Sequence, residues 1–217
     1  MTDTPFAGFP VAALDFYDDL EMDNTKSFWE KHKHVYDEAV KAPMQALMAA
    51  LTPEFAPDGQ SAKIFRPYRD VRFAKDKTPY KTHQGAYVAV AQSTGWYVQV
   101  SAGGVRTGAG FYEASGPRLS SFRDAVASEL TGPELTKILA RLERSGVTIG
   151  GDRLKTTPRG FDSDHPRIDL LRHKTLTVGR ELGFGPEIST AKLLDLVRKD
   201  WRAYRPLVEW VVAHSAG

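Results

Sequence analysis

The chain has 217 residues, of which 41% are hydrophobic, including 11 Phe, 8 Tyr and 4 Trp, and its formal net charge is +2. This length and composition fit one folded domain and exclude an intrinsically disordered protein. The chain contains no cysteine, which excludes disulfides, cysteine-ligated zinc fingers, iron–sulfur clusters and a thiol nucleophile.

The charge is distributed unevenly along the chain. Residues 1–60 carry four Lys or Arg against eleven Asp or Glu, whereas residues 61–81 carry seven against two. No run of about 18 apolar residues is present, and residues 1–11 do not have the pattern of a signal peptide. We therefore expect a cytoplasmic protein without a membrane partner.

The first part of the chain is predicted to be helical. Leu14, Tyr17 and Leu20 recur at spacing three, and Asn24 or Ser27 is expected to cap the next helix, with Ser27 and Glu30 in capping-box spacing. Pro43 lacks the N–H donor that an uninterrupted helix needs, so we expect a kink or a restart there. An apolar stripe over 44–51 then predicts core packing up to Pro53.

The middle of the chain changes to the period of two that is typical of strands. Residues 85–91 and 96–101 alternate, and the Gly103–Gly104 pair predicts a tight hairpin into a third strand at 105–112. Gly108 and Gly110 suggest either a bulge or a close approach by another backbone or a ligand.

Helical patterns return over 117–130 and 133–145, with Gly146 as the expected stop. We expect a small hairpin over 147–155, a strand near 175–178 and a closing helix from about residue 189 that restarts at Pro206. The prediction is a single α+β domain over 1–217, in which N-terminal and C-terminal helices flank a compact antiparallel sheet made of a three-stranded meander and a short hairpin.

The densest candidate for function is the segment 63–81. Arg66, Arg69, Arg72 and Lys75 recur at spacing three, which places them on one face of an extended left-handed or 3₁₀-like backbone. Guanidinium groups held on one face could clamp a phosphate or a carboxylate. The residues that we expect to bind such an anion are Arg66, Arg69, Arg72, Lys75, Lys77 and Lys81.

The acidic residues of this segment allow other interpretations. Asp70 and Asp76 could orient the arginines, act as acid and base, or neutralise the cations in a structural ion-pair network. The whole segment could also be a solvated charged face. His83 is the only histidine that we would test in acid–base chemistry. The supporting residues of the predicted site are Tyr68, Asp70, Asp76, Tyr80, His83, Arg159 and Arg172.

The string FRPYRDVRFAKDKTPYKTH at 65–83 resembles the signature of a bacterial and fungal family known as domain of unknown function 2461. The stretches 24–43, 96–112 and 158–176 are similar to the same family, so the resemblance spans nearly the whole chain. It implies a single α+β domain with 63–81 as its characteristic element, and it implies no activity, substrate or cofactor. Val71 departs from the pattern, in which a small polar residue is more usual.

A second candidate segment covers residues 158–174. Asp162, Asp164 and His165 could meet at a metal, but the segment lacks the distal Glu and central Gly of a calcium loop, so we expect no metal site. The simpler interpretation is an Asp-rich turn that leads into a helix. A third is that Arg159, Arg172 and Lys174 extend the anion site.

Three functional hypotheses follow. In the preferred one, Arg66, Arg69 and Arg72 hold a small phosphorylated or carboxylated molecule while Asp70 orients an arginine. In the second, the cations and the aromatic residues Phe65, Tyr68, Phe73 and Tyr80 track and stack a nucleic acid. In the third, the segment is structural or binds a protein, with the acidic residues 1–60 as its partner. The sequence predicts no particular cofactor, reaction or oligomeric state.

Overall fold

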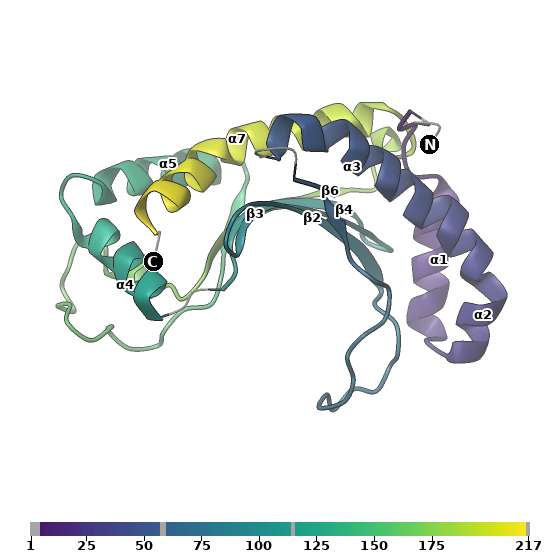
Figure 1. Ribbon diagram of the computed structural model, residues 1–217, viewed down its shortest axis with the longest axis horizontal. Coiled ribbons are helices and arrows are strands. Elements are labelled where there is room, and N and C mark those ends of the chain that lie inside the picture. The colour runs from purple at the N-terminus through teal and green to yellow at the C-terminus, as the bar shows by residue number, and fades with distance from the viewer. Residues whose placement is uncertain (1–4, 57–59, 114–115, 216–217) are drawn as a thin grey trace. The chain divides into compact units, whose positions relative to one another are not determined.

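The structure is a computed structural model that describes residues 5–56, 60–113 and 116–215. It has the predicted α+β fold, in which helices flank a six-stranded antiparallel sheet of order β1-β2-β3-β4-β6-β5 (Figure 1). The strands are β1 Lys63–Ile64, β2 His83–Ala91, β3 Thr94–Ser101, β4 Gly104–Phe111, β5 Thr148–Gly150 and β6 Leu176–Gly183. The helices are α1 Val11–Met22, α2 Lys26–Val35, α3 Ala42–Phe55, α4 Gly116–Ala127, α5 Gly132–Arg144, α6 Ile168–Leu171 and α7 Lys192–His214.

The chain divides into two compact units, and the division crosses several strands and α7. Unit 1 comprises residues 1–88, 97–107 and 181–199, and unit 2 comprises 89–96, 108–180 and 200–217. Each unit has its own core. In unit 1, α1, α2 and α3 contribute large buried side chains that include Tyr17, Trp29 and Leu47. In unit 2, Phe111 packs edge-on against Phe122 of α4 at 5.1 Å, and Phe122 contacts Trp210 of α7.

The N-terminal helices differ from the prediction in their caps. The N-cap of α2 is Thr25, whose hydroxyl accepts from the backbone N–H of Phe28 at 3.2 Å, and the predicted caps Asn24 and Ser27 are therefore wrong. The restart expected at Pro43 is confirmed, because a π-helical segment, Tyr36–Lys41, precedes α3 and Pro43 lies in the first turn of α3. A proline in the first turn leaves no intrahelical donor unmet.

The three predicted strands of the meander are present as β2, β3 and β4, and β3 shows the predicted alternation. Trp96, Val98 and Val100 of β3 are buried, whereas Tyr97 and Gln99 between them are only half-buried. Gly110 of β4 has a positive φ of 130°, and a Cβ there would lie 2.2 Å from the carbonyl oxygen of Leu176. The close backbone approach expected at this glycine is therefore confirmed.

Two predictions about the C-terminal half are wrong. The hairpin over 147–155 does not form, because β5 pairs with β6, with Ile149 opposite Val178, and Arg153 bridges His173 instead. Helix α7 runs through Pro206 without a restart. A short 3₁₀ helix, Pro186–Ser189, precedes α7.

Candidate functional site

The basic loop, which we define as residues 63–81, leaves the sheet between β1 and β2 in unit 1 (Figure 1). Its two legs run antiparallel: Tyr68 bridges Tyr80, and the N–H groups of Arg69 and Lys81 donate to the carbonyls of Pro79 and Pro67, each at 2.8 Å. The chain therefore reverses direction within the segment. The row of Arg66, Arg69, Arg72 and Lys75 therefore extends from one leg into the far end of the loop.

Aromatic side chains from α2 anchor the legs. The rings of Trp29 and Tyr80 stack at 4.4 Å with an interplanar angle of 9°, and Tyr68 lies 6.0 Å from Trp29. The side chain of Asn24 donates to the carbonyl of Tyr80 at 3.0 Å and accepts from its N–H at 3.1 Å. Tyr68 and Tyr80 thus fix the position of the loop.

The far end of the loop, residues 69–78, is called the loop tip. Arg69 donates to the Asp76 carboxylate and to the Thr78 hydroxyl. Arg72 forms a bidentate pair with Asp70, with its Nε and Nη2 at 3.0 and 2.7 Å from the two carboxylate oxygens. Two of the predicted anion-binding arginines are therefore already paired with carboxylates of the same loop.

These pairs lower the pKa of both carboxyl groups, as expected for carboxylates that accept hydrogen bonds from guanidinium groups. The hydrogen bond from Arg69, followed by the hydrogen bonds from Thr78, lowers the pKa of Asp76 to about 2. The hydrogen bonds from Arg72 also lower the pKa of Asp70. Both acids are ionised at neutral pH, so neither one is suited to donate a proton.

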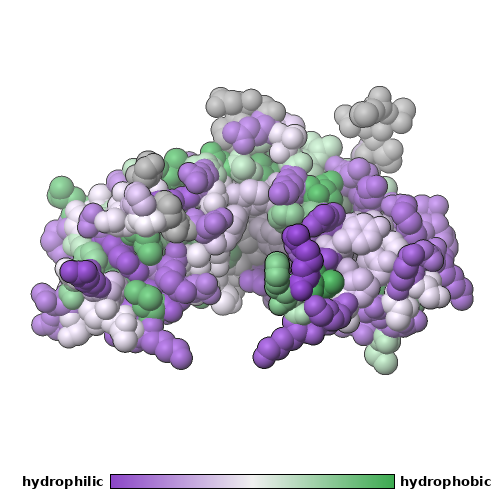
Figure 2. Space-filling view, turned by 60° about the horizontal axis from the view of Figure 1, so that its bottom comes forward, coloured by the Kyte–Doolittle hydropathy of each residue, from purple (hydrophilic) through white to green (hydrophobic). Residues whose placement is uncertain are grey.

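The remaining residues of the loop tip differ in their contacts. Lys77 donates to the carbonyls of Val71 and Arg72, at 2.9 and 3.4 Å. Lys75 is exposed and pairs with no carboxylate of the described chain. Phe73 is 97% exposed. In Figure 2 the loop comes forward near the middle of the view, where strongly hydrophilic residues surround a few hydrophobic ones.

The other end of the loop gathers cations without carboxylates, and we call Lys63, Arg66 and Lys81 the base cluster. The ammonium groups of Lys63 and Lys81 each lie 5.5 Å from the centre of the Phe65 ring, within the range of a cation–π contact. Lys81 also donates to the carbonyl of Arg66 at 2.9 Å. Among residues 5–56, 60–113 and 116–215, no carboxylate lies within 4 Å of these three side chains.

The base cluster is electrostatically strained. Burial, then the charges of Arg66 and Lys63, lowers the pKa of the Lys81 ammonium. Burial and the charge of Lys81 also lower the pKa of His83. Each shift disfavours the protonated form, so an anion placed here would oppose both shifts. The charge of Arg66 also helps to lower the pKa of Asp70, so Arg66 interacts with this carboxylate as well.

A glycine shapes the surface beside the base cluster. A Cβ at Gly85 would lie 2.6 Å from the hydroxyl of Tyr97 and 3.1 Å from the ring of Phe65. Both rings therefore close over Gly85, and the Tyr97 hydroxyl donates to Gln99 at 2.8 Å. Burial raises the pKa of Tyr97 to about 12, so this hydroxyl remains a hydrogen-bond donor at neutral pH.

The second candidate segment belongs to unit 2. Arg159 is exposed, and Arg172 pairs with Asp169 at 3.1 Å. No group of three His, Asp or Glu in the described part of the chain is arranged to hold a metal ion. Because these residues lie in unit 2 and the basic loop lies in unit 1, the structure does not join Arg159 or Arg172 to the predicted anion site.

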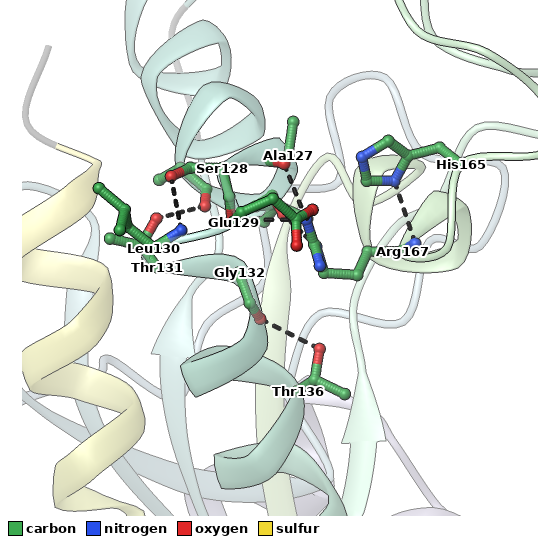
Figure 3. Close-up of polar contacts among 11 residues, drawn as sticks. Ala127, Ser128, Glu129, Leu130, Thr131, Gly132, Thr136, His165 and Arg167 are labelled. Atoms are coloured by element: carbon green, nitrogen blue, oxygen red, sulfur yellow. Dashed lines mark hydrogen bonds and ion pairs between the residues drawn. The ribbon is translucent and has the colours of Figure 1, made fainter.

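The principal polar residue of that segment is Arg167, which sequence reasoning missed. Its guanidinium donates to the carbonyls of Val126 and Ala127 at 2.7 and 2.8 Å and contacts the Glu129 carboxylate at 2.5 Å (Figure 3). These carbonyls end α4 and have no intrahelical donor. Arg167 thus caps α4, a role that no local pattern predicts, because its partners lie about 40 positions earlier.

Sequence reasoning also missed Lys63 and Trp29. The spacing-three row that singled out the arginines does not include Lys63. A cation two positions before an aromatic residue, on the same face of an extended segment, was the available signal, since Lys63 contacts the ring of Phe65. Nothing local indicated Trp29, which meets Tyr80 only through tertiary packing.

One of three comparisons with known proteins finds a match. A family model described as a conserved hypothetical protein, DUF2461, matches residues 12–210. The chain belongs to this family. No curated protein and no solved structure matches it. In the described residues, no helix is both long enough and apolar enough to cross a bilayer.

Proposed function

We propose that the protein binds a small anionic molecule, bearing a phosphate or a carboxylate, at the base cluster. The observation that carries this proposal is the gathering of Lys63 and Lys81 at the Phe65 ring, close enough to Arg66 for its charge to lower the pKa of Lys81, with no carboxylate of the described chain within ion-pair distance of the three. Lys63 and Arg66 are exposed and Lys81 is half-buried, and like charges held close together repel one another unless a counter-charge lies beside them.

The donors at the base cluster suit an oxyanion. Arg66 offers five N–H donors in a planar fork, and no hydrogen bond of the described chain uses its guanidinium. Lys81 uses one of its three donors on the Arg66 carbonyl, so two remain for a ligand. A planar fork beside two ammonium groups matches the bidentate geometry of carboxylate or phosphate.

The loop tip is proposed to support the base rather than to bind the ligand. Arg69 and Arg72 already satisfy Asp76 and Asp70, so an anion there would have to displace bonded carboxylates. Of the predicted anion-binding set, Arg66 and Lys81 remain in the proposal, and Lys63 joins them. We propose that this binding takes place in the cytoplasm and leave open whether a reaction follows.

The test is a calorimetric titration with inorganic phosphate and with citrate as probes, on the full chain and on single variants. Arg66→Ala and Lys63→Ala are each expected to weaken binding by about tenfold, the effect of losing one charge-assisted contact. The matched control is Lys75→Ala, which removes one positive charge from the loop tip and should leave affinity within about twofold. Binding that neither base variant alters, or no saturable binding by either probe, would overturn the proposal.

The pKa of His83 gives an independent measure of anion binding at the base cluster. Burial and Lys81 lower its pKa, and a bound anion would favour its protonated form. Its pKa, followed by NMR, should therefore rise when phosphate is added, and phosphate should bind more tightly as the pH falls through that range. A His83 pKa that phosphate leaves unchanged would place the anion elsewhere.

A second candidate function, nucleic-acid binding, is favoured by one observation at the loop tip. Phe73 is 97% exposed and lies between Arg72 and Lys75, an arrangement that can stack a base and contact its phosphates. Single-stranded oligonucleotides should then bind at about 50 mM salt, lose affinity steeply with added salt, and require Phe73. Unchanged binding in Phe73→Ala, or affinity that is flat with salt, would exclude it.

A further inference from the structure

A cavity of about 290 Å³ lies in unit 2, whereas the basic loop belongs to unit 1. It is formed by α5, by the β5 region and by the turn that leads into α6. Its walls are largely aliphatic, and the apolar residues that line it are Leu139, Ala140, Ile149, Pro166 and Leu170. Its volume is close to the lower limit of about 300 Å³ for sites of drug-sized ligands, so a smaller molecule fits it best.

Four charged residues also line the cavity, and two of them are already committed to neighbours. Arg167 extends to the end of α4 and to Glu129 (Figure 3). Asp169 holds Arg172 at 3.1 Å. Both side chains therefore already have a charged partner.

The other two, Arg153 and Glu143, carry opposite charges and are exposed. Across residues 5–56, 60–113 and 116–215 neither side chain makes a hydrogen bond or an ion pair, with each other or with any other residue. The cavity therefore presents one uncommitted guanidinium and one uncommitted carboxylate beside an aliphatic surface.

We propose that this cavity binds a free amino acid with an aliphatic side chain. The guanidinium of Arg153 would pair with the α-carboxylate, and Glu143 would accept from the α-ammonium group. The aliphatic walls would cover the side chain and remove its surface from water. A peptide terminus carries only one of the two charges, so it would leave the opposite rim residue without a partner.

The test is a titration of the full chain with L-leucine up to about 10 mM, a range that detects millimolar affinity, followed by calorimetry and by NMR shifts of α5. Two analogues act as matched probes: 4-methylpentanoate lacks the ammonium group, and 3-methylbutylamine lacks the carboxylate. We expect saturable binding of leucine and at least about tenfold weaker binding of each analogue, because each loses one charge-assisted contact.

Variants then assign the two charges. Arg153→Ala and Glu143→Gln should each weaken leucine binding by about tenfold, whereas Arg141→Ala and Glu134→Gln are controls on exposed positions of α5 that do not line the cavity. Because the substituted positions are exposed, we expect the variants to keep their fold, and circular dichroism melting checks this. No saturation by leucine, equal binding of either analogue, or unchanged affinity in both rim variants would overturn the proposal.

Discussion

The two ends of the basic loop use the same residue types to opposite effect. At the tip, Arg69 and Arg72 are paired with Asp76 and Asp70, so both ion pairs form within the loop itself. At the base, Lys63 and Lys81 contact the Phe65 ring, and neither they nor Arg66 forms an ion pair with a carboxylate of the described chain. The contrast is the basis of our proposal that the cations bind an anion only where they lack a carboxylate partner.

Reversing one charge at the base should have the largest effect. In Lys81→Glu the new carboxylate would pair with Arg66 and Lys63, so the base would resemble the tip. We expect phosphate binding to fall by at least about 100-fold, because a like charge then faces the ligand. The melting temperature should stay the same or rise, since a repulsion is replaced by an attraction.

The matched control for that change is Lys77→Glu, which introduces the same charge at the tip. Its effect on phosphate affinity should be several times smaller. Equal losses in the two variants, measured by calorimetry, would mean that the ends of the loop are not distinct and that only net charge matters.

Removing the carboxylates of the tip should make it resemble the base. In a double variant, Asp70→Asn with Asp76→Asn, Arg69 and Arg72 lose their charged partners while the side chains keep their size. We expect a gain of up to about tenfold in apparent phosphate affinity, or a second bound phosphate, as two guanidinium groups become available. If the double variant keeps its circular dichroism spectrum and gains no phosphate affinity, the result would contradict the view that ion pairing prevents Arg69 and Arg72 from binding phosphate.

The smallest effect concerns the acid titration of the tip. Asp76 should titrate with a pKa of about 2, whereas an unperturbed aspartate titrates near 3.9. Because the folded-state pKa of Asp76 is lowered, its pair with Arg69 stabilises the folded state at pH values above the unfolded-state pKa. This stabilisation is lost as the pH falls toward 2. In Arg69→Ala the pKa of Asp76 should rise toward the ordinary value, and carboxyl-detected NMR would follow both. An Asp76 that titrates normally in the unmodified chain would show that the pair does not form in solution.

Local patterns predicted most of the fold correctly. The period of two in β3 and the glycine pair at 103–104 are properties of adjacent residues, and the meander followed from them. The hairpin over 147–155 was wrong for the converse reason. The short strand at 148–150 buries its backbone groups against β6, and the identity of a distant partner strand is not encoded in the turn residues.

The candidate site was predicted in part. The charge count located the segment 63–81, and Arg66 and Lys81 were among the residues expected to bind an anion. The assumption of one continuous backbone conformation then failed, because Tyr68 meets Tyr80 and folds the segment back on itself. That reversal brings Asp76 to Arg69 across seven positions and so removes an arginine from the predicted site.

The sequence by itself determined the α+β class and the place of the basic segment, because helix and strand periods, turn glycines and clustered charges are local properties. The family followed from the resemblance of whole sequence motifs. Only the tertiary structure decided which cations are compensated. Pairing of Arg69 with Asp76, the stacking of Trp29 on Tyr80 and the capping of α4 by Arg167 all join positions that are separated along the chain. Electrostatic and packing energies depend on distance in space, and spacing in sequence does not fix that distance.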